Sequence, residues 1–360
     1  MDSSTCNCLR VNQVTRILII TNSFKPYVGG IETFTESLAK GLLEKGYSVS
    51  VAVKLDIPII SGLPTPIAPE VFPIHFAANM LEVWKMSRRC EIVIFSQFSL
   101  HYFPIVFLSR AKYFIVHHTS DLIYSKSLTF IERIKRTICK NLDNVFVSKS
   151  LMEIVNLPGK VIHNGTVWPW IGPQHQTSRA IDVLYVGRLV QGKGVETLVH
   201  AMSYLKSVHP NLEIKTMVIG EGNLGARLER LTRKYQLEDV VTFVGVQDAE
   251  TVRESMLASK TVIVPSEFHE PFGLVAIEAL MAGCIPIVSN LGGILEACHG
   301  RAITFEPGNV KQLSEVIHRT LVSLPEIEQG IFQNLEPSSF NINRMILDYE
   351  NHITNRLHTL

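Results

Sequence analysis

The chain has 360 residues, which is too many for one ordinary hydrophobic core and about right for two domains. Hydrophobic residues make up 46% of the chain and charged residues 19%, which excludes an intrinsically disordered protein. The net charge is only +1, but it is unevenly placed: residues 1–165 hold 18 basic and 12 acidic side chains, and the remaining residues hold 16 and 21. Such asymmetry is typical of a protein in which one half meets an anionic surface or substrate.

Cysteine usage and apolar segments indicate a cytoplasmic chain. The six cysteines are scattered and do not form the framework of a disulfide-rich secreted protein. The apolar stretch 17–20 is too short for a signal peptide. The uncharged run 92–109 approaches the length of a membrane span, but Gln97, His101 and Pro104 interrupt it, which favours a buried strand, a loop and a buried helix.

Strand and helix patterns alternate along the first part of the chain. Strands are expected at 16–20, 48–53, 91–95, 113–116, 144–147 and 160–163. After the first strand, an amphipathic helix ends at Gly46. Apolar, β-branched strands that alternate with helices predict a parallel sheet covered on both faces.

The same alternation restarts after a segment rich in Gly, Pro and polar residues at 164–180, which indicates a linker. Strands are expected at 182–186, 214–220, 241–245, 261–265 and 285–289, and the clearest helices at 223–235 and 272–282. The sequence therefore predicts two Rossmann-like, doubly wound α/β domains, 1–165 and 166–335. Because open α/β sheets bind ligands at the carboxyl ends of their strands, two such sheets would face an interdomain cleft.

Two glycine-bearing loops at strand ends are candidates for binding an anion. Gly29 and Gly30 begin the helix after the first strand, where backbone amides can approach an anion, although a tight turn alone also explains this pair. In "GRLVQGKG", Arg188 and Lys193 lie five residues apart, which suits a diphosphate better than it suits two solvated surface charges.

A third loop, "HEPFGLVAIE", places two carboxylates around the start of a helix. Glu270 precedes the helix, and the free amides of Phe272, Gly273 and Leu274 would point into the cleft. Glu278 lies further along the same helix, and two carboxylates can accept hydrogen bonds from the hydroxyl groups of one bound molecule. A capping glutamate followed by a surface glutamate is the alternative.

Histidines at another strand end complete the candidates. His117 and His118 follow a strand in "VHHTSD" and would bind or donate to a substrate, although a partly buried histidine with a structural partner is the alternative. The chain has no Asp-x-Asp pair and no His/Cys ligand spacing, so we expect no metal and no other cofactor. Nucleic-acid motifs and a complete Walker lysine loop are absent from the sequence.

In order along the chain, these motifs resemble those of retaining GT-B glycosyltransferases of glycosyltransferase family 4. The resemblance extends from about residue 16 to residue 307 and rests on "GGIE", "VHHT", "IHNG", "GRLVQGKG", "GEGN", "FVG" and "EFHEPFGLVAIEALMAG". It implies transfer of a hexose from a nucleotide-diphosphate sugar to an acceptor hydroxyl without a metal. The implied acceptor is a lipid-linked sugar, a polysaccharide or another glycoconjugate, such as a lipopolysaccharide or glycolipid.

The resemblance also implies a role for individual residues. Arg188 and Lys193 would hold the donor diphosphate, Glu278 the ribose and Glu270 the transferred sugar, and His118 matches the family's active-site histidine better than His117. The remaining donor-binding positions are Gly29, Gly30, Phe272, Gly273 and Leu274 at the diphosphate, and Gly220, Gly222 and Val246 around the nucleotide base. Residues 336–360 would form a helix that returns to the first domain.

The acceptor side and the rival functions stay open. The segment 54–90 is short and proline-rich, and the basic segments 84–89 and 131–140 fit peripheral docking on an anionic membrane at its inner face. A solvated helix face is the alternative. The rival functions are a sugar phosphorylase or a nucleotide-sugar epimerase of the same fold, and a non-catalytic nucleotide-sugar-binding subunit.

Overall fold

The structure is a computed structural model, which describes residues 14–24, 29–54, 72–77, 79–97, 102, 105, 108–119, 130–173 and 179–358. Contacts divide the chain into two compact units, which are described one at a time. The first unit comprises Met1–His118, Thr137–Val145 and Ile346–Leu360, and the second comprises Thr119–Arg136 and Phe146–Met345. The domain boundaries expected at 165 and 335 stay predictions.

The first sheet has its topological switch at its centre. Its strands are β1 (Arg16–Thr21), β2 (Ser48–Lys54), β3 (Ile74–Ala77), β4 (Ile92–Ser96), β5 (Lys112–His117), β6 (Asn144–Phe146) and β7 (Lys160–Val161). They lie in the order β3-β2-β1-β4-β5-β6-β7, and β1 pairs in parallel with both β2 and β4. The order of the strands reverses between β1 and β4, which is where open α/β sheets bind ligands.

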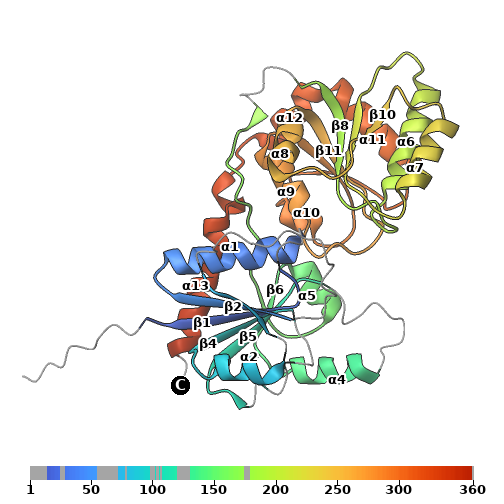
Figure 1. Ribbon diagram of the computed structural model, residues 1–360. Helices are drawn as coiled ribbons and strands as arrows, with labels where there is room; N and C mark the ends of the chain where they lie inside the picture. The colour runs from blue at the N-terminus through green and yellow to red at the C-terminus, as the bar shows by residue number, and fades with distance from the viewer. Residues whose placement is uncertain are drawn as a thin grey trace, which may run out of the picture. The chain divides into compact units, whose positions relative to one another are not determined.

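Helices cover both faces of this sheet. The helix α1 (Gly30–Glu44) lies on one face and α2 (Met80–Ser87) on the other (Figure 1). The strand β1 is buried from its second residue onward, because "RILIIT" is an apolar run that suits a strand covered on both faces. The short elements β3 and α2 fall in the proline-rich segment for which the sequence predicted no elements.

The last helix is α13 (Ile342–His358), and its part from Ile346 onward belongs to the first unit and packs on α1. The ring of Tyr349 lies 5.5 Å from the ring of Phe34, measured between centroids. Ile346 occupies the space above Gly41, where an added Cβ would lie 2.1 Å from its Cδ1 atom. A glycine on α1 therefore allows the close approach of α13.

The second sheet repeats this plan. Its strands are β8 (Ile181–Val186), β9 (Thr216–Ile219), β10 (Val241–Phe243), β11 (Ser259–Val264), β12 (Ile285–Ser289) and β13 (Ile303–Phe305). They lie in the order β10-β9-β8-β11-β12-β13. The pairs that β8 and β11 form with each other and with β9 and β12 are all parallel. The switch point lies between β8 and β11, so the loops that leave these two strands are the expected ligand-binding loops.

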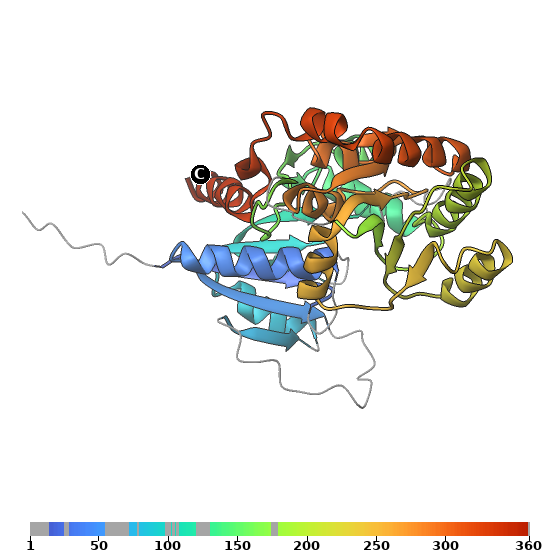
Figure 2. The ribbon, with the colours of Figure 1, turned by 90° about the horizontal axis from the view of Figure 1, so that it is seen from above.

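Helices also cover both faces of the second sheet. The helices of this unit are α5 (Lys149–Val155), α6 (Val195–Val208), α7 (Gly225–Lys234), α8 (Ala249–Leu257), α9 (Leu274–Met281), α10 (Ile294–Ala297), α11 (Val310–Val322) and α12 (Leu324–Phe332). One hydrophobic cluster joins α6, α7 and α11 to one face, and another joins α8 and α9 to the opposite face. Figure 2 shows α6, in yellow-green, beside α11, in orange-red.

The predicted fold class, two doubly wound parallel α/β units, is confirmed. Within the described ranges, no helix combines the length and the apolar sequence that crossing a membrane requires.

Candidate active site

The loops after β8 and β11 pack directly on each other, and glycines make this possible. Gly194 has a positive φ of 71°, and an added Cβ would lie 1.7 Å from the carbonyl oxygen of Pro265. Gly192 also has a positive φ, and a Cβ there would lie 3.2 Å from the ring of Phe268. The amide of Glu267 donates to the carbonyl of Gly192 at 2.7 Å. The two loops at the switch point therefore form one continuous surface.

At the centre of this surface, Lys193 forms an ion pair with the Oε1 atom of Glu270. The hydroxyl of Ser266 donates to the same oxygen at 2.7 Å. The Lys193 ammonium also lies 4.9 Å from the centroid of the Phe268 ring, a cation–π contact. Glu270 is buried, with 8% of its surface exposed. In the described part of the chain both contacts fall on Oε1, which leaves Oε2 able to accept a hydrogen bond from a ligand hydroxyl.

Arg188 supplies a second positive charge on the loop after β8. Its side chain is exposed, and its guanidinium forms no ion pair with any residue that the structure describes. The backbone beneath it is fixed, because the buried hydroxyl of Tyr185 donates to the carbonyl of Arg188 at 3.0 Å. Burial raises the pKa of Tyr185, so this phenol stays a protonated donor. Within the described residues, Arg188 thus presents an unpaired cation on a backbone that Tyr185 holds in place.

The start of α9 provides a third electropositive feature. Gly273 occupies the N-cap position with a φ of 103°, and no side chain caps the helix. Phe272 is buried beside it, and Leu274 opens the helix. Because the first amides of a helix lack intrahelical partners, this end carries partial positive charge. The structure therefore places the predicted amides directly after Glu270.

Glu278 lies within α9 and is partly buried. Burial raises the pKa of its carboxyl group from 4.5 to about 7. Its carboxylate has no hydrogen bond or ion pair within the described ranges. A pair of ligand hydroxyls would supply the missing donors and favour the ionised form.

This raised pKa predicts a pH dependence of stability. Between about pH 4.5 and 7 the folded state binds a proton on Glu278 that the unfolded state has released, so the free energy of unfolding falls as pH rises through this window. We expect Glu278→Gln to remove this decline, which amounts to roughly 3 kcal/mol across the window. Urea unfolding at several pH values measures it, and equal pH slopes in both proteins would refute the assignment.

The turns after β9 and β10 contact each other beside Arg188. These turns contain the residues that were predicted to surround the nucleotide base. The amide of Gly220 donates to the carbonyl of Gly245 at 2.8 Å. An added Cβ at Gly222 would lie 2.2 Å from the carbonyl oxygen of Leu189, so glycine is required for this approach. Val246 is 65% exposed and leaves an apolar side chain at the surface. Base binding at these turns stays a prediction.

In the first unit, the imidazole of His118 is buried at the end of the sheet. Its Nε2 atom lies 3.2 Å from the hydroxyl oxygen of Ser96, and its ring lies 4.3 Å from the ring of Phe34. Burial lowers the pKa of His118 to about 3 and that of His117 to about 4, so both rings are neutral. The Nε2 atom of His117 is held by Asn144 at 2.9 Å, which fits a structural role.

Gly29 and Gly30 stand at the N-terminus of α1, as predicted. Gly29 is the N-cap, with an extended φ of −167° that any residue adopts, and as a glycine it has no side chain of its own to cap the helix. Among the described residues, a Cβ on Gly29 would meet only the end of the Glu32 side chain, at 2.6 Å. Their conformation therefore gives no reason of its own for glycine, and anion binding here stays a prediction.

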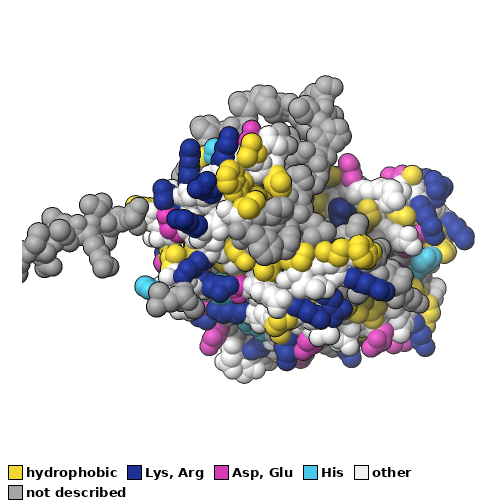
Figure 3. Space-filling model, turned by 90° about the horizontal axis from the view of Figure 1, so that it is seen from below, with side chains coloured by type: hydrophobic (Ala, Val, Ile, Leu, Met, Phe, Trp, Pro, Cys, Tyr) yellow, Lys and Arg dark blue, Asp and Glu magenta, His cyan; other side chains and the backbone are white. Residues whose placement is uncertain are grey.

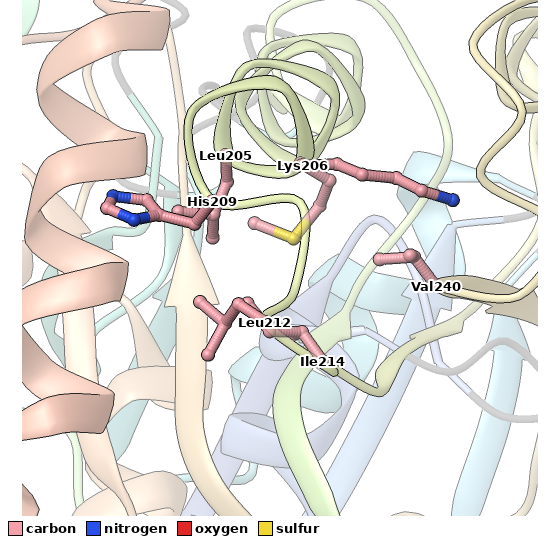
Figure 4. Close-up of a pocket in the computed structure, with 7 residues that line it drawn as sticks. Leu205, Lys206, His209, Leu212, Ile214 and Val240 are labelled. Carbon is pink, nitrogen blue, oxygen red and sulfur yellow. The ribbon is translucent and has the colours of Figure 1, made fainter.

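In the described ranges, neither a metal cluster nor the hollow beside α6 involves these loops. Among the described residues, no group of three or more His, Cys, Asp or Glu side chains is placed to hold a metal ion. Figure 4 shows a small hollow beside α6, in which the Lys206 amine points outward, toward Asp239. Its lining belongs mostly to the hydrophobic core and includes none of the predicted site residues.

Sequence reasoning missed several residues that shape this site. Ser266 donates a hydrogen bond to Glu270, and the Phe268 ring contacts Lys193. The hydroxyl of Tyr185 donates to the carbonyl of Arg188. Ser266 could have been found, because it is a polar residue directly after an apolar strand at the ligand-binding end of the sheet. Tyr185 could not have been found in this way, because it lies inside a strand, where its sequence context is that of an ordinary core residue.

Comparison with known proteins decides the class of enzyme. The sequence profile of the family described as "Glycosyl transferases group 1" matches residues 172–328. An uncharacterized glycosyltransferase of Methanocaldococcus jannaschii is 28% identical over 327 residues, which cover 78% of this chain and 82% of that protein. The chain is a glycosyltransferase with the GT-B fold. The prediction that it is an enzyme of this class is thereby confirmed.

Solved structures share the fold of this glycosyltransferase. Anabaena HepE in complex with UDP and glucose has a TM-score of 0.75 and 16% identity, over 95% of this chain and all of that one. Sucrose-phosphate synthase from Thermosynechococcus elongatus has a TM-score of 0.70 and 19% identity, over 95% of this chain and 98% of that one. At these identities the likeness concerns the fold alone.

Proposed function

We propose that this glycosyltransferase is a retaining, family 4 enzyme that moves a hexose from a nucleotide-diphosphate sugar to an acceptor hydroxyl. The observation that carries the proposal is the convergence of Arg188, Lys193 and Glu270 on the switch point of the second sheet. The complex of HepE with UDP and glucose supports a donor of this kind.

In this proposal the donor diphosphate replaces Glu270 as the partner of Lys193. Arg188 and the uncapped start of α9 add positive charge on the same surface, so the diphosphate is stabilised as it leaves. No resident metal takes part in the step. The released Glu270 carboxylate accepts hydrogen bonds from hydroxyls of the transferred sugar, while Glu278 accepts from the ribose hydroxyls.

The reaction breaks the bond between the anomeric carbon and the diphosphate oxygen. The acceptor oxygen forms its bond to the same carbon on the same face, so the configuration is retained. The acceptor proton passes to the departing diphosphate, which leaves as the nucleoside diphosphate. His118, which is neutral, acts as a hydrogen-bonding group toward the sugar and not as a cation.

The acceptor is proposed to be lipid-linked or part of a polysaccharide or other glycoconjugate, reached by peripheral docking on the cytoplasmic face of an anionic membrane. The helix α4 (Phe130–Cys139) supports this proposal, since Phe130 and Ile134 are 78% and 38% exposed beside the exposed Arg133 and Lys140. Figure 3 shows hydrophobic side chains next to Lys and Arg on the side that carries α4. Such a face suits an anionic bilayer surface.

The double variant Phe130→Ser, Lys140→Glu tests this docking. We expect it to bind phosphatidylglycerol vesicles about tenfold more weakly than the unaltered protein, because it loses an apolar anchor and reverses a charge. Cosedimentation measures binding, and Lys311→Glu, an exposed lysine on α11, is the matched control. Vesicle binding equal to that of the control would rule the surface out.

A donor panel tests the proposed reaction. The protein is incubated in EDTA with UDP-glucose, GDP-glucose or ADP-glucose, each with and without a mixture of glycolipid and polysaccharide acceptors, and the released nucleoside diphosphate is measured. Release that rises when the acceptors are added supports the proposal. Sugar release that requires inorganic phosphate would instead favour a phosphorylase, and binding without any release would favour a non-catalytic subunit.

A further inference from the structure

Two serines on the first turn of α5 hold the residues on either side of Glu270. The hydroxyl of Ser148 donates to the carbonyl oxygen of Pro271 at 2.6 Å. The hydroxyl of Ser150 lies 2.9 Å from the Nε2 atom of His269. The other ring nitrogen of His269 is buried without a partner in the part of the chain that the structure describes, so Ser150 is the group that orients this ring. Glu270 itself is thus bracketed by contacts from one helix.

A partly buried carboxylate in turn holds the N-terminus of α5. Glu296 accepts hydrogen bonds from the amides of Lys149 and Ser150, at 2.7 and 3.0 Å. Its Oε1 atom also lies 2.8 Å from the Nε2 atom of His163. Burial acts to raise the pKa of Glu296, but the hydrogen bonds outweigh it and lower the pKa. The ionised carboxylate therefore fixes α5 at the end that carries the two serines.

The backbone of Glu270 is also held by the residue that precedes α10. The amide of Gly293 donates to the carbonyl of Glu270 at 2.7 Å. An added Cβ on Gly293 would lie 2.3 Å from the carbonyl oxygen of Pro271 and 2.7 Å from the hydroxyl of Ser148. The turn that carries Glu270 therefore packs closely against both α5 and the start of α10.

We propose that Ser148 and Ser150 are positioning residues for Glu270, and that Glu296 acts through them by anchoring α5. The inference rests on the proposed contact between Glu270 and the transferred sugar. During the proposed reaction, the Glu270 carboxylate leaves Lys193 and binds sugar hydroxyls. It keeps its orientation toward the sugar through this change only if its backbone does not move. Rigid support of this kind lowers the barrier by holding the productive geometry in advance.

The decisive variant is Ser150→Ala, because alanine favours a helix more than serine does and leaves α5 intact. We expect kcat with UDP-glucose to fall about fivefold, the effect of one lost hydrogen bond, while the dissociation constant for UDP stays unchanged. Ser150→Thr keeps a hydroxyl and is expected to restore kcat. Ser255→Ala, which removes a serine-to-carbonyl bond within α8, is the matched control.

Glu296→Ala is expected to lower kcat more than Ser150→Ala does, because it releases the whole first turn of α5. Because the loss of Glu296 could also unfold the protein, the test rests on the comparison of Ser150→Ala with Ser150→Thr. Unchanged kcat in Ser150→Ala, or a parallel loss of UDP affinity, would overturn this inference alone. If the unaltered protein releases no nucleoside diphosphate from any donor of the panel, the proposed function falls, and this inference falls with it.

Discussion

Lys193→Ala is expected to lower kcat/KM for the sugar nucleotide by roughly 10² to 10³, the cost of removing one preorganised charge from a developing anion. The variant loses the group that pairs with Glu270 in the free protein and with the diphosphate in the proposed complex. Both UDP affinity and turnover should fall, because the diphosphate is present in the bound donor and in the transition state. Steady-state kinetics and UDP titration measure the two effects.

Lys260→Ala is the matched control for this variant. Lys260 also forms an ion pair in the second unit, at 2.6 Å from Asp182, but it lies at the opposite end of β11 from Glu270. Loss of Lys193 leaves a buried carboxylate without its cation, so thermal unfolding of both variants must be compared first. Turnover in folded Lys193→Ala equal to that of Lys260→Ala would contradict the proposed role.

Glu270→Gln is expected to lower kcat by roughly 10² while UDP affinity stays the same or rises. The amide keeps an oxygen that can accept from Ser266 but removes the charge that Lys193 now pairs with. Lys193 then reaches the diphosphate without leaving an ion pair, whereas the sugar loses its charged acceptor. Turnover and UDP affinity should therefore move separately here, unlike in Lys193→Ala.

Glu267→Gln controls for any change of charge in the same loop. Glu267 is exposed and accepts from the hydroxyl of Thr197, a contact that glutamine can keep. Its kinetics should match those of the unaltered protein. If Glu270→Gln were as active as Glu267→Gln, or if its UDP affinity fell as far as its turnover, Glu270 would not be the sugar ligand.

Much of the fold could be predicted from the sequence, because buried parallel strands are apolar runs that stand out from their surroundings. "RILIIT" and the strands that follow it have this pattern, and the rule that ligands bind at the carboxyl ends of strands directed attention to Arg188, Lys193 and Glu270. The strand β3 has four residues beside a proline-rich segment, which is too short a pattern to recognise.

The side-chain contacts that hold the site residues in place could not be predicted in the same way. The Lys193–Glu270 pair joins positions 77 residues apart, and Ser150 and His269 are 119 residues apart. Each of these side chains has several partners of suitable chemistry in the sequence, and only the packing of the loops selects one. Ser148 and Ser150 look like ordinary helix-start residues, so their contacts beyond α5 leave no local signal.

The most direct test is a calorimetric titration of UDP, GDP and ADP into the unaltered protein and into Arg188→Ala. Arg188 has no ion pair in the described part of the chain, so its loss removes charge from the site without leaving a buried group unpaired. We predict that at least one diphosphate binds the unaltered protein and that its affinity falls at least tenfold in the variant. Folded protein that binds none of the three, or equal affinity in Arg188→Ala, would contradict a diphosphate site on this loop.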